Sequence, residues 1–104
     1  INTTSPEMFQ GERKPRFERV RKASAGCNYG GDCHSYGLVA SGYLDLSIEA
    51  GMQAYDYMAL VPVVEGAGGK VSDWAGEPLN LNSDGSTIAA GDARLHAEVV
   101  SVLA

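Results

Sequence analysis

Two carboxylates seven positions apart, Glu49 and Asp56, are the side chains in this sequence with the clearest potential for chemistry. Glu49 ends a segment that alternates like a strand, and Asp56 opens an apolar segment with helical spacing. In α/β sheets, ligands bind where strand ends and helix N-termini meet over short loops. An aspartate there either caps the helix or binds a hard cation. The residues alone leave both roles open for Asp56.

A second candidate group is Gly30, Gly31 and Asp32, a glycine pair followed by a carboxylate. Asp32 directly precedes a segment with helical spacing, which is the position of an N-cap. Glu49, read without further context, is a solvated strand end. The first group of polar residues, Thr3 and Thr4, also stands at a strand end, and the sequence does not choose which of the two approaches a pocket.

The two cysteines of the chain, Cys27 and Cys33, do not form a zinc pattern, even with His34 beside the second one. Two close thiols in an otherwise cysteine-free chain favour reduced core thiols in a cytoplasmic protein. We expect His96 to be a surface or packing residue and Trp74 to pack in the core or a turn.

The composition is that of one small folded domain. The 104 residues are 44% hydrophobic and 20% charged, with a formal net charge of -5. The longest apolar stretch, 58–64, is too short to cross a bilayer, and the acidic balance disfavours a nucleic-acid partner. The chain opens at Ile1 inside an expected strand, which fits a fragment or a processed chain.

One basic cluster has helical spacing, with Phe17 and Val20 on the opposite, inward side. We interpret it as a solvated helix face, since no aromatic ladder supports a nucleic-acid or substrate patch. Its members are Arg13, Lys14, Arg16, Arg19, Arg21 and Lys22.

Strand and helix patterns alternate along the chain, which predicts an α/β domain with helices packed on a mixed sheet. Strands are expected at 1–4, 24–29, 43–49, 70–74 and 87–90, and helices at 5–9, 15–22, 33–42, 56–65 and after a cap at Asp92. The strand 43–49 alternates cleanly, so Ser47 and Glu49 should share its polar side. Pro62 should kink or interrupt the helix that begins at Asp56, because proline lacks the amide for the helical ladder.

The string from Glu49 to Asp56, followed by an apolar helix and a glycine pair, resembles the C-terminal signature of the inositol monophosphatase family. That signature reads W/Y-D-x-x-A/L, then an apolar helix, then E-A/G-x-G-G. The matching residues are Tyr55, Asp56, Ala59, Glu65, Gly68 and Gly69, and later matches are Val71, Asp73, Trp74, Gly76, Pro78, Leu79, Ala90, Gly91 and Asp92. The resemblance covers essentially residues 1–104 and implies the C-terminal α/β subdomain of a layered sandwich, without the N-terminal catalytic half.

Within the family, the chain is most similar to the histidinol-phosphate phosphatase branch, through segments 3–9, 31–42, 55–57 and 61–65. Inositol monophosphatases usually carry a tryptophan at the position of Tyr55 and a small residue at the position of Asp32.

The resemblance implies Mg²⁺-dependent hydrolysis of a phosphate monoester. Asp56 matches the family's C-terminal metal-binding aspartate, so it is the expected catalytic and metal-ligating residue. Glu49 matches the residue that contacts the non-phosphate part of the substrate, and Gly30, Gly31 and Asp32 match a loop that lines the same pocket. The remaining ligands belong to an acidic N-terminal segment and a D-P-[IL]-D-G-T motif, which this chain lacks. We therefore expect the 104-residue chain alone to be inactive.

Histidinol phosphate carries an ammonium group and an imidazole, so Asp32 and Glu49 would bind it through charge-assisted hydrogen bonds. A neutral polyol gains less from two carboxylates, which makes a polyol phosphatase of the inositol monophosphatase type the alternative enzyme. The alternative outside enzymes is a binding or regulatory module that keeps the fold. The complete protein is expected to form a homodimer in the cytoplasm.

Overall fold

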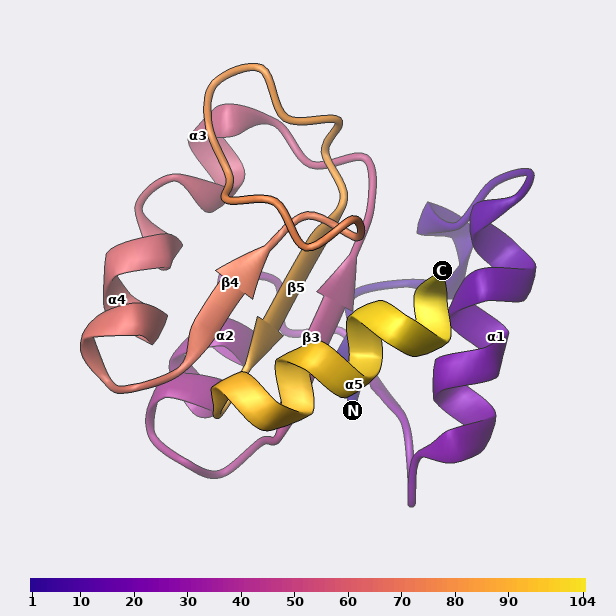
Figure 1. Cartoon of the computed structure of the whole chain (residues 1–104), viewed down its shortest axis with the longest axis horizontal. Coiled ribbons are helices and arrows are strands. Elements are labelled where there is room, and N and C mark those ends of the chain that lie inside the picture. The colour runs from indigo at the N-terminus through magenta and orange to yellow at the C-terminus, as the bar shows by residue number, and fades with distance from the viewer.

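The computed structural model describes all residues, 1–104, as an α/β arrangement around one five-stranded sheet (Figure 1). The strand order is β2-β1-β3-β5-β4. The strands are β1 (Asn2–Thr3), β2 (Asn28–Tyr29), β3 (Leu46–Glu49), β4 (Lys70–Ser72) and β5 (Thr87–Ala90). The helices are a 3-10 turn η1 (Pro6–Met8), α1 (Arg13–Ala23), α2 (Cys33–Ala40), α3 (Ala54–Tyr57), α4 (Leu60–Gly66) and α5 (Ala93–Leu103). The expected mixed sheet with packed helices is confirmed.

The sheet is mixed because its two halves are connected differently. β1 runs parallel to both β2 and β3, whereas β5 runs antiparallel to β3 and β4. In the central pair, Leu46 lies opposite Ala90 and Glu49 lies opposite Thr87. The last residues of β1, β2 and β3 therefore lie at the same edge of the sheet, where a pocket can form.

Two hydrophobic clusters cover the two faces of the sheet. On the face of α1 and α5, a cluster of eleven buried residues includes Phe17, Ile48, Ile88 and Leu103. On the opposite face, under α2 and α4, five buried residues form a smaller cluster that includes Ala89. Successive residues of β5 alternate between the clusters, as the pleat of a strand requires.

Strand β3 alternates as expected, but both of its faces are buried. Leu46 and Ile48 join the larger cluster. Ser47 and Glu49 point to the other side, and their residues are 0% and 2% exposed. The alternative role of Glu49 as a solvated strand end is therefore wrong, because α2 covers that face.

The helix expected to run from Asp56 to Glu65 is two short helices. α3 ends at Tyr57 and α4 begins at Leu60, so the break falls just before Pro62. The missing amide of Pro62 removes the hydrogen bond that would tie it to Met58, four residues back. The interruption is confirmed, but the first of the two helices begins at Ala54, ahead of Asp56.

The inward side of the basic helix is confirmed, because Phe17 and Val20 are buried. Two of its arginines are not simply solvated. Arg16 and Arg19 donate to backbone carbonyls at the end of α5, including the carbonyl of Leu103 at 2.6 and 3.2 Å. They satisfy carbonyls that the helix itself cannot. Arg16 also lies over the Trp74 ring, 5.2 Å from its centre.

The expectations for the two cysteines were wrong in part, whereas those for Trp74 and His96 are confirmed. Both thiols are free, but Cys33 is exposed and Cys27 only half-buried, so the expectation of core thiols was wrong. Trp74 is buried in the larger cluster, and His96 is a packing residue, 4% exposed. None of the helices has the length and apolar character needed to cross a membrane.

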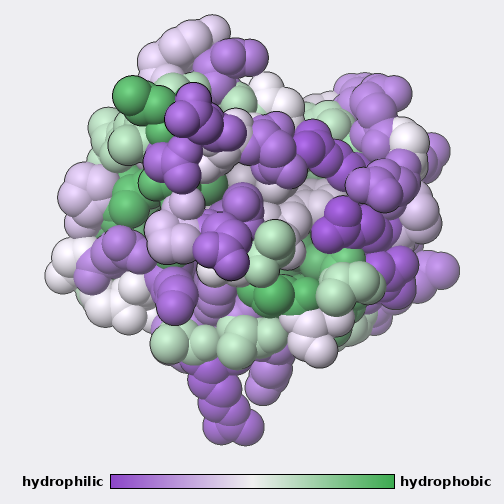
Figure 2. Space-filling model, turned by 45° about the horizontal axis from the view of Figure 1, so that its top comes forward, coloured by the Kyte–Doolittle hydropathy of each residue, from purple (hydrophilic) through white to green (hydrophobic).

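The face seen in Figure 2 is mainly hydrophilic, and hydrophobic side chains gather in small separate areas of it. The most exposed large ones are Tyr43 and Tyr55, each 85% exposed, and Leu81. Tyr55 directly precedes the candidate metal ligand Asp56.

Candidate functional site

An open pocket of about 470 Å³ brings three of the predicted site residues together. Asp32 comes from the loop before α2, Glu49 from the end of β3, and Asp56 from α3. The remaining walls are mostly apolar or small, formed by Met8, Cys33, Gly51, Met52, Tyr55 and Leu60. Gly30 and Gly31 do not line this pocket. They precede it in the loop that carries Asp32.

The loop that presents Asp32 has an unusual backbone. Gly30 and Gly31 have φ angles of 92° and 96°, and Asp32 itself has φ 43° and ψ -129°. Asp32 is the non-glycine residue of the chain with a positive φ, a conformation outside the regions that L-residues ordinarily occupy. Asp32 occupies the N-cap position of α2, but its side chain makes no capping hydrogen bond. Asp32 is therefore the N-cap by position, without a side-chain capping bond, and its exposed carboxylate lines the pocket.

The backbone of this loop is held by β1. The Asn2 side chain donates to the Gly30 carbonyl at 2.9 Å, and the Gly30 amide donates to the carbonyls of Thr3 and Thr4 at 3.0 and 2.9 Å. The first strand therefore fixes the path of the glycine pair.

Glu49 is a buried carboxylic acid at the floor of the pocket. It is 2% exposed, and its Oε1 atom is buried without a hydrogen-bond partner. Burial raises the pKa of Glu49; Thr4 and Tyr36 lower it, and the nearby Asp32 carboxylate raises it. An unpaired buried carboxylate is costly, so its environment favours a positively charged or hydrogen-bond-donating group in the pocket.

Near Glu49, a layer of hydroxyl groups lies between α2 and the sheet and joins them by hydrogen bonds. The Tyr36 hydroxyl and Thr87 Oγ1 are 2.7 Å apart, and Ser35 Oγ is 3.0 Å from Ser47 Oγ. Tyr36 is fully buried, and burial followed by the charge of Glu49 raises its pKa well above the ordinary value. This side chain therefore stays neutral beside the carboxyl group.

Asp56 caps a helix with one carboxylate oxygen and leaves the other oxygen free. One carboxylate oxygen, Oδ2, accepts from the Gln53 amide at 2.7 Å, which ties the loop to the first turn of α3. The other oxygen accepts no hydrogen bond within the chain, and the residue is exposed in the pocket. The two roles that the sequence left open are compatible, because they use different oxygens. α3 has only four residues, so its dipole adds little to anion binding.

The donor set fits one corner of a magnesium site. Mg²⁺ prefers six oxygen ligands and often takes only one or two carboxylates from a protein. The second Asp56 oxygen is suited to that role, but the chain nowhere brings three or more His, Cys, Asp or Glu side chains into metal-binding proximity.

Several residues of the site were not found from the sequence. Of the two candidate threonines, Thr3 is fully buried with its hydroxyl toward Met8 Sδ, and Thr4 is the one that adjoins Glu49. Tyr36 is four positions after Asp32, one helical turn along α2, which was the available signal for its position near the pocket. His34 is exposed and does not line the pocket.

The glycine pair of the motif 65–69 has a packing reason. A Cβ atom on Gly69 would lie 2.5 Å from the Ala90 carbonyl and 2.8 Å from Val64 Cγ1. The turn between α4 and β4 therefore passes against β5 too closely for any side chain. This motif sets the distance between α4 and the sheet rather than contacting the pocket.

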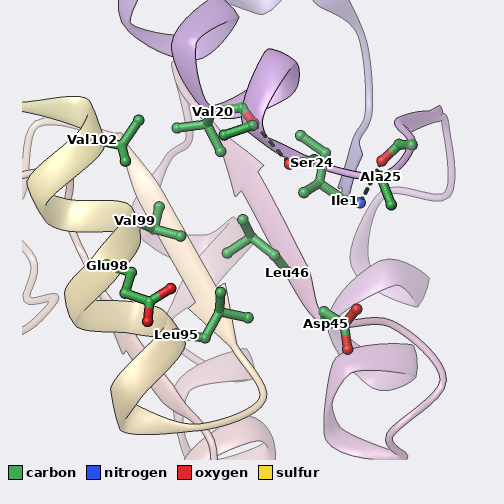
Figure 3. A pocket seen from close by; sticks show the side chains of 12 residues that line it. Ile1, Val20, Ser24, Ala25, Asp45, Leu46, Leu95, Glu98, Val99 and Val102 are labelled. Atoms are coloured by element: carbon green, nitrogen blue, oxygen red, sulfur yellow. Dashed lines mark hydrogen bonds between the residues drawn. The ribbon is translucent and has the colours of Figure 1, made fainter.

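A second pocket, of about 320 Å³, lies on the other face of the sheet between α1, α5 and β3 (Figure 3). Its wall is largely aliphatic, with Val20, Leu46, Leu95, Val99 and Val102 turned toward it, and it contains none of the predicted site residues. Its character is that of a gap between packed helices, without groups for phosphate chemistry.

Known proteins are similar to this chain in sequence and in fold. The chain is 42% identical over 110 residues to a bifunctional phosphatase IMPL2 of Arabidopsis thaliana, covering 99% of this chain and 32% of that protein. A histidinol-phosphatase of Chlorobaculum parvum is 36% identical over 55 residues, which is 53% of this chain and 21% of that protein. An inositol monophosphatase structure from Zymomonas mobilis superposes with a TM-score of 0.95 at 46% identity, covering 98% of this chain and 40% of that one.

The chain thus spans between a fifth and two fifths of the length of these relatives. The sequence model of the inositol monophosphatase family matches residues 3–104. This match includes Thr3 of β1, the Asp32 loop, Glu49 and Asp56, which belong to the segments that assemble the pocket. The chain therefore belongs to the inositol monophosphatase family.

Proposed function

We propose that the complete protein to which this chain belongs is a Mg²⁺-dependent phosphatase of small phosphate monoesters whose non-phosphate part is cationic, with histidinol phosphate as the first candidate. The observation that carries the proposal is the pair of carboxylates Asp32 and Glu49 on one pocket with Asp56. The Chlorobaculum relative is named a histidinol-phosphatase, which supports the same substrate class.

The geometry of the pocket supports different roles for its three carboxylates. Asp56 would hold a magnesium ion through its second oxygen, while its first keeps the Gln53 amide and so fixes the carboxylate orientation. When bound, Mg²⁺ neutralises phosphate charge and lowers the pKa of a bound water. Asp32 and Glu49 would bind the remainder of the ester and orient it, so the phosphate group is placed toward Asp56.

The electrostatics of the pair favour a cation over a neutral polyol. Burial raises the pKa of Glu49, and the Asp32 charge adds a smaller increase because the two negative charges repel each other. An ammonium or imidazolium group between them would remove that repulsion and give Glu49 the partner that it lacks. Hydroxyl groups of a polyol would satisfy the hydrogen bonds but would not neutralise the charge.

The test compares histidinol phosphate and inositol 1-phosphate as substrates of the complete protein with Mg²⁺. We expect a higher kcat/KM for histidinol phosphate. Asp32→Asn should lower it by about tenfold or more for this ester, because a charge-assisted pair is lost, and much less for the polyol ester. A matched control is Asp45→Asn, which replaces an exposed aspartate outside this pocket. It should leave kcat/KM unchanged for both esters.

A phosphatase of polyol phosphates is the second candidate. It is supported by the likeness to the Zymomonas mobilis inositol monophosphatase over 98% of this chain. A preference for inositol 1-phosphate that survives Asp32→Asn would favour this candidate and contradict the cationic one. A complete protein that hydrolyses neither ester would instead favour a binding or regulatory module with the same fold.

A further inference from the structure

Thr4 lies beside the proposed substrate pocket. The roles proposed above for the three carboxylates do not involve it. In the parallel pairing of β1 and β3, Asn2 lies opposite Ser47. Continuing that register by two residues places Thr4 opposite Glu49, on the same face of the sheet. The backbone of Thr4 is fixed there, because its carbonyl accepts from the Gly30 amide at 2.9 Å.

Thr4 and Glu49 also share an unusual hydrogen-bonding state. Thr4 Oγ1 and Glu49 Oε1 are the two buried side-chain oxygens of the chain without a hydrogen-bond partner. Buried polar atoms in folded proteins are nearly always satisfied, and exceptions occur at functional sites. Burial raises the pKa of Glu49, and the Thr4 hydroxyl and amide lower it. The hydroxyl nevertheless makes no hydrogen bond in this structure.

We propose that Thr4 is a positioning residue for Glu49: its hydroxyl supports the carboxylate and keeps it aimed into the pocket, and so determines the affinity for a cationic group. A small rotation of the threonine hydroxyl lets it donate to the carboxylate, whose other lone pairs stay directed to the ligand. Tyr36 is a second hydroxyl beside Glu49, but it is also paired with Thr87 and stays the same in any Thr4 variant.

Other ionisable groups around the pocket contribute to the charge that Glu49 experiences. Those on α2 and the loop before it are Asp32, Cys33 and Tyr36, and those on α3 are Tyr55 and Asp56. None of them is changed by a substitution at Thr4, so a Thr4 variant isolates the hydroxyl.

The proposal rests on the proposed function only for the nature of the ligand, and the first experiment does not use a ligand at all. The carboxyl group of Glu49 is titrated by ¹³C NMR in the complete protein, with its signal assigned by its loss in Glu49→Gln. Thr4→Val keeps the shape and removes the hydroxyl, Thr4→Ala also removes it without risk of overpacking, and Thr4→Ser restores it.

We expect the Glu49 titration midpoint to move to higher pH in Thr4→Val and Thr4→Ala, and to return toward the parent value in Thr4→Ser. The sign follows because a donor to the carboxylate favours the charged form, and its loss favours the neutral one. An unchanged midpoint in both Thr4→Val and Thr4→Ala would overturn the proposal. An equal shift in Thr4→Ser would also overturn it, because the effect would then come from packing.

The second experiment measures KM for histidinol phosphate against pH. In Thr4→Val, KM should rise by about tenfold near the acid limb, which moves to higher pH, while kcat changes little. A protein that hydrolyses neither ester would refute the proposed function but leave the NMR result to decide the role of Thr4. A preference for histidinol phosphate with an unmoved acid limb in Thr4→Val would refute the role of Thr4 alone.

Discussion

At the scale of single residues, the pocket is defined by carboxylates in three different environments. Asp32 is exposed on a strained backbone, Glu49 is buried without a partner, and Asp56 has one oxygen engaged and one available. Environment rather than residue type separates their proposed roles: the two that lack a partner are suited to recognise a ligand cation, and the one that is half-satisfied is suited to hold a metal ion.

The two oxygens of Asp56 lead to a prediction about its replacement. Asp56→Asn retains a carbonyl oxygen that can accept from the Gln53 amide, so the free energy of unfolding should change little. Mg²⁺-dependent activity of the complete protein should fall by at least about 100-fold, since even losing a residue that supports a metal ligand costs 10–100-fold. Phosphate release assays and thermal unfolding on the same variant check both halves. Unchanged kinetics would remove Asp56 from the metal site.

His96 gives a prediction for the pH dependence of stability. Its Nε2 lies 2.6 Å from Ser72 Oγ, in a buried contact between α5 and β4. Burial, and then the charge of Lys70, lower the pKa of His96 below its ordinary value, although Glu65 opposes this. The unfolded chain therefore binds this proton at higher pH than the folded one. The resulting stability is complete above about pH 6.5 and is lost as the pH falls from there toward the folded pKa.

Urea unfolding of the parent protein and of His96→Gln between pH 5 and 7.5 measures this contribution. The free energy of unfolding of the parent should fall more steeply below about pH 6.5. The variant keeps a polar partner for Ser72 and loses the titrating group, so the difference between the two curves isolates His96. Parallel curves would contradict the prediction.

At the scale of elements, the separation between α4 and the sheet depends on a glycine. Gly69→Ala should destabilise the protein by about 1–3 kcal/mol, as overpacked sites do, because its Cβ would overlap the backbone of β5. Gly66→Ala is the matched control: it lies in α4 with no atom within 4 Å of the added Cβ. There, replacing glycine in a helix should be neutral or stabilising by about 0.5–1 kcal/mol.

Thermal or urea unfolding of the two variants decides this prediction. Equal effects of the two substitutions would mean that the glycine pair has no packing role and that the motif serves another purpose.

The elements also explain why the pocket lies where it does. β1 and β3 are parallel neighbours, so the residues that follow their ends, Thr4 and Ala50, meet at one edge. The loop after β2 is fixed to β1 by Asn2 and by the Gly30 amide, and it delivers Asp32 to the same edge. α3 then closes the pocket from the side, with the capping hydrogen bond of Asp56 fixing its first turn.

At the scale of the whole molecule, the two faces of the sheet differ in polarity. The face under α1 and α5 carries the larger hydrophobic cluster, with stacked Phe9 and Phe17 rings 4.1 Å apart at their centres. The face under α2 carries the hydroxyl groups of Ser35, Tyr36, Ser47 and Thr87, which lie near Glu49. A rigid apolar layer on one side thus supports polar side chains on the other, whose positions matter for ligand binding.

The sequence by itself determined the order of elements, the family and the three carboxylates, because these depend on local periodicity and on motifs contained in short segments. It also indicated the interruption at Pro62, since that follows from one missing amide. Tertiary structure decided what surrounds each carboxylate. Glu49 has a polar side chain in an alternating strand, which suggests solvent, yet the packing of α2 buries it.

The choice of Thr4 over Thr3 likewise depended on which strand neighbours β3 and in what register, a contact between residues 45 positions apart that no local pattern encodes. Local sequence also did not show that Asp32 would have a positive φ and make no capping bond with its side chain. Local propensity set the elements, and long-range packing set the environment of Glu49 and its neighbours, because burial and charge are properties of the assembled site.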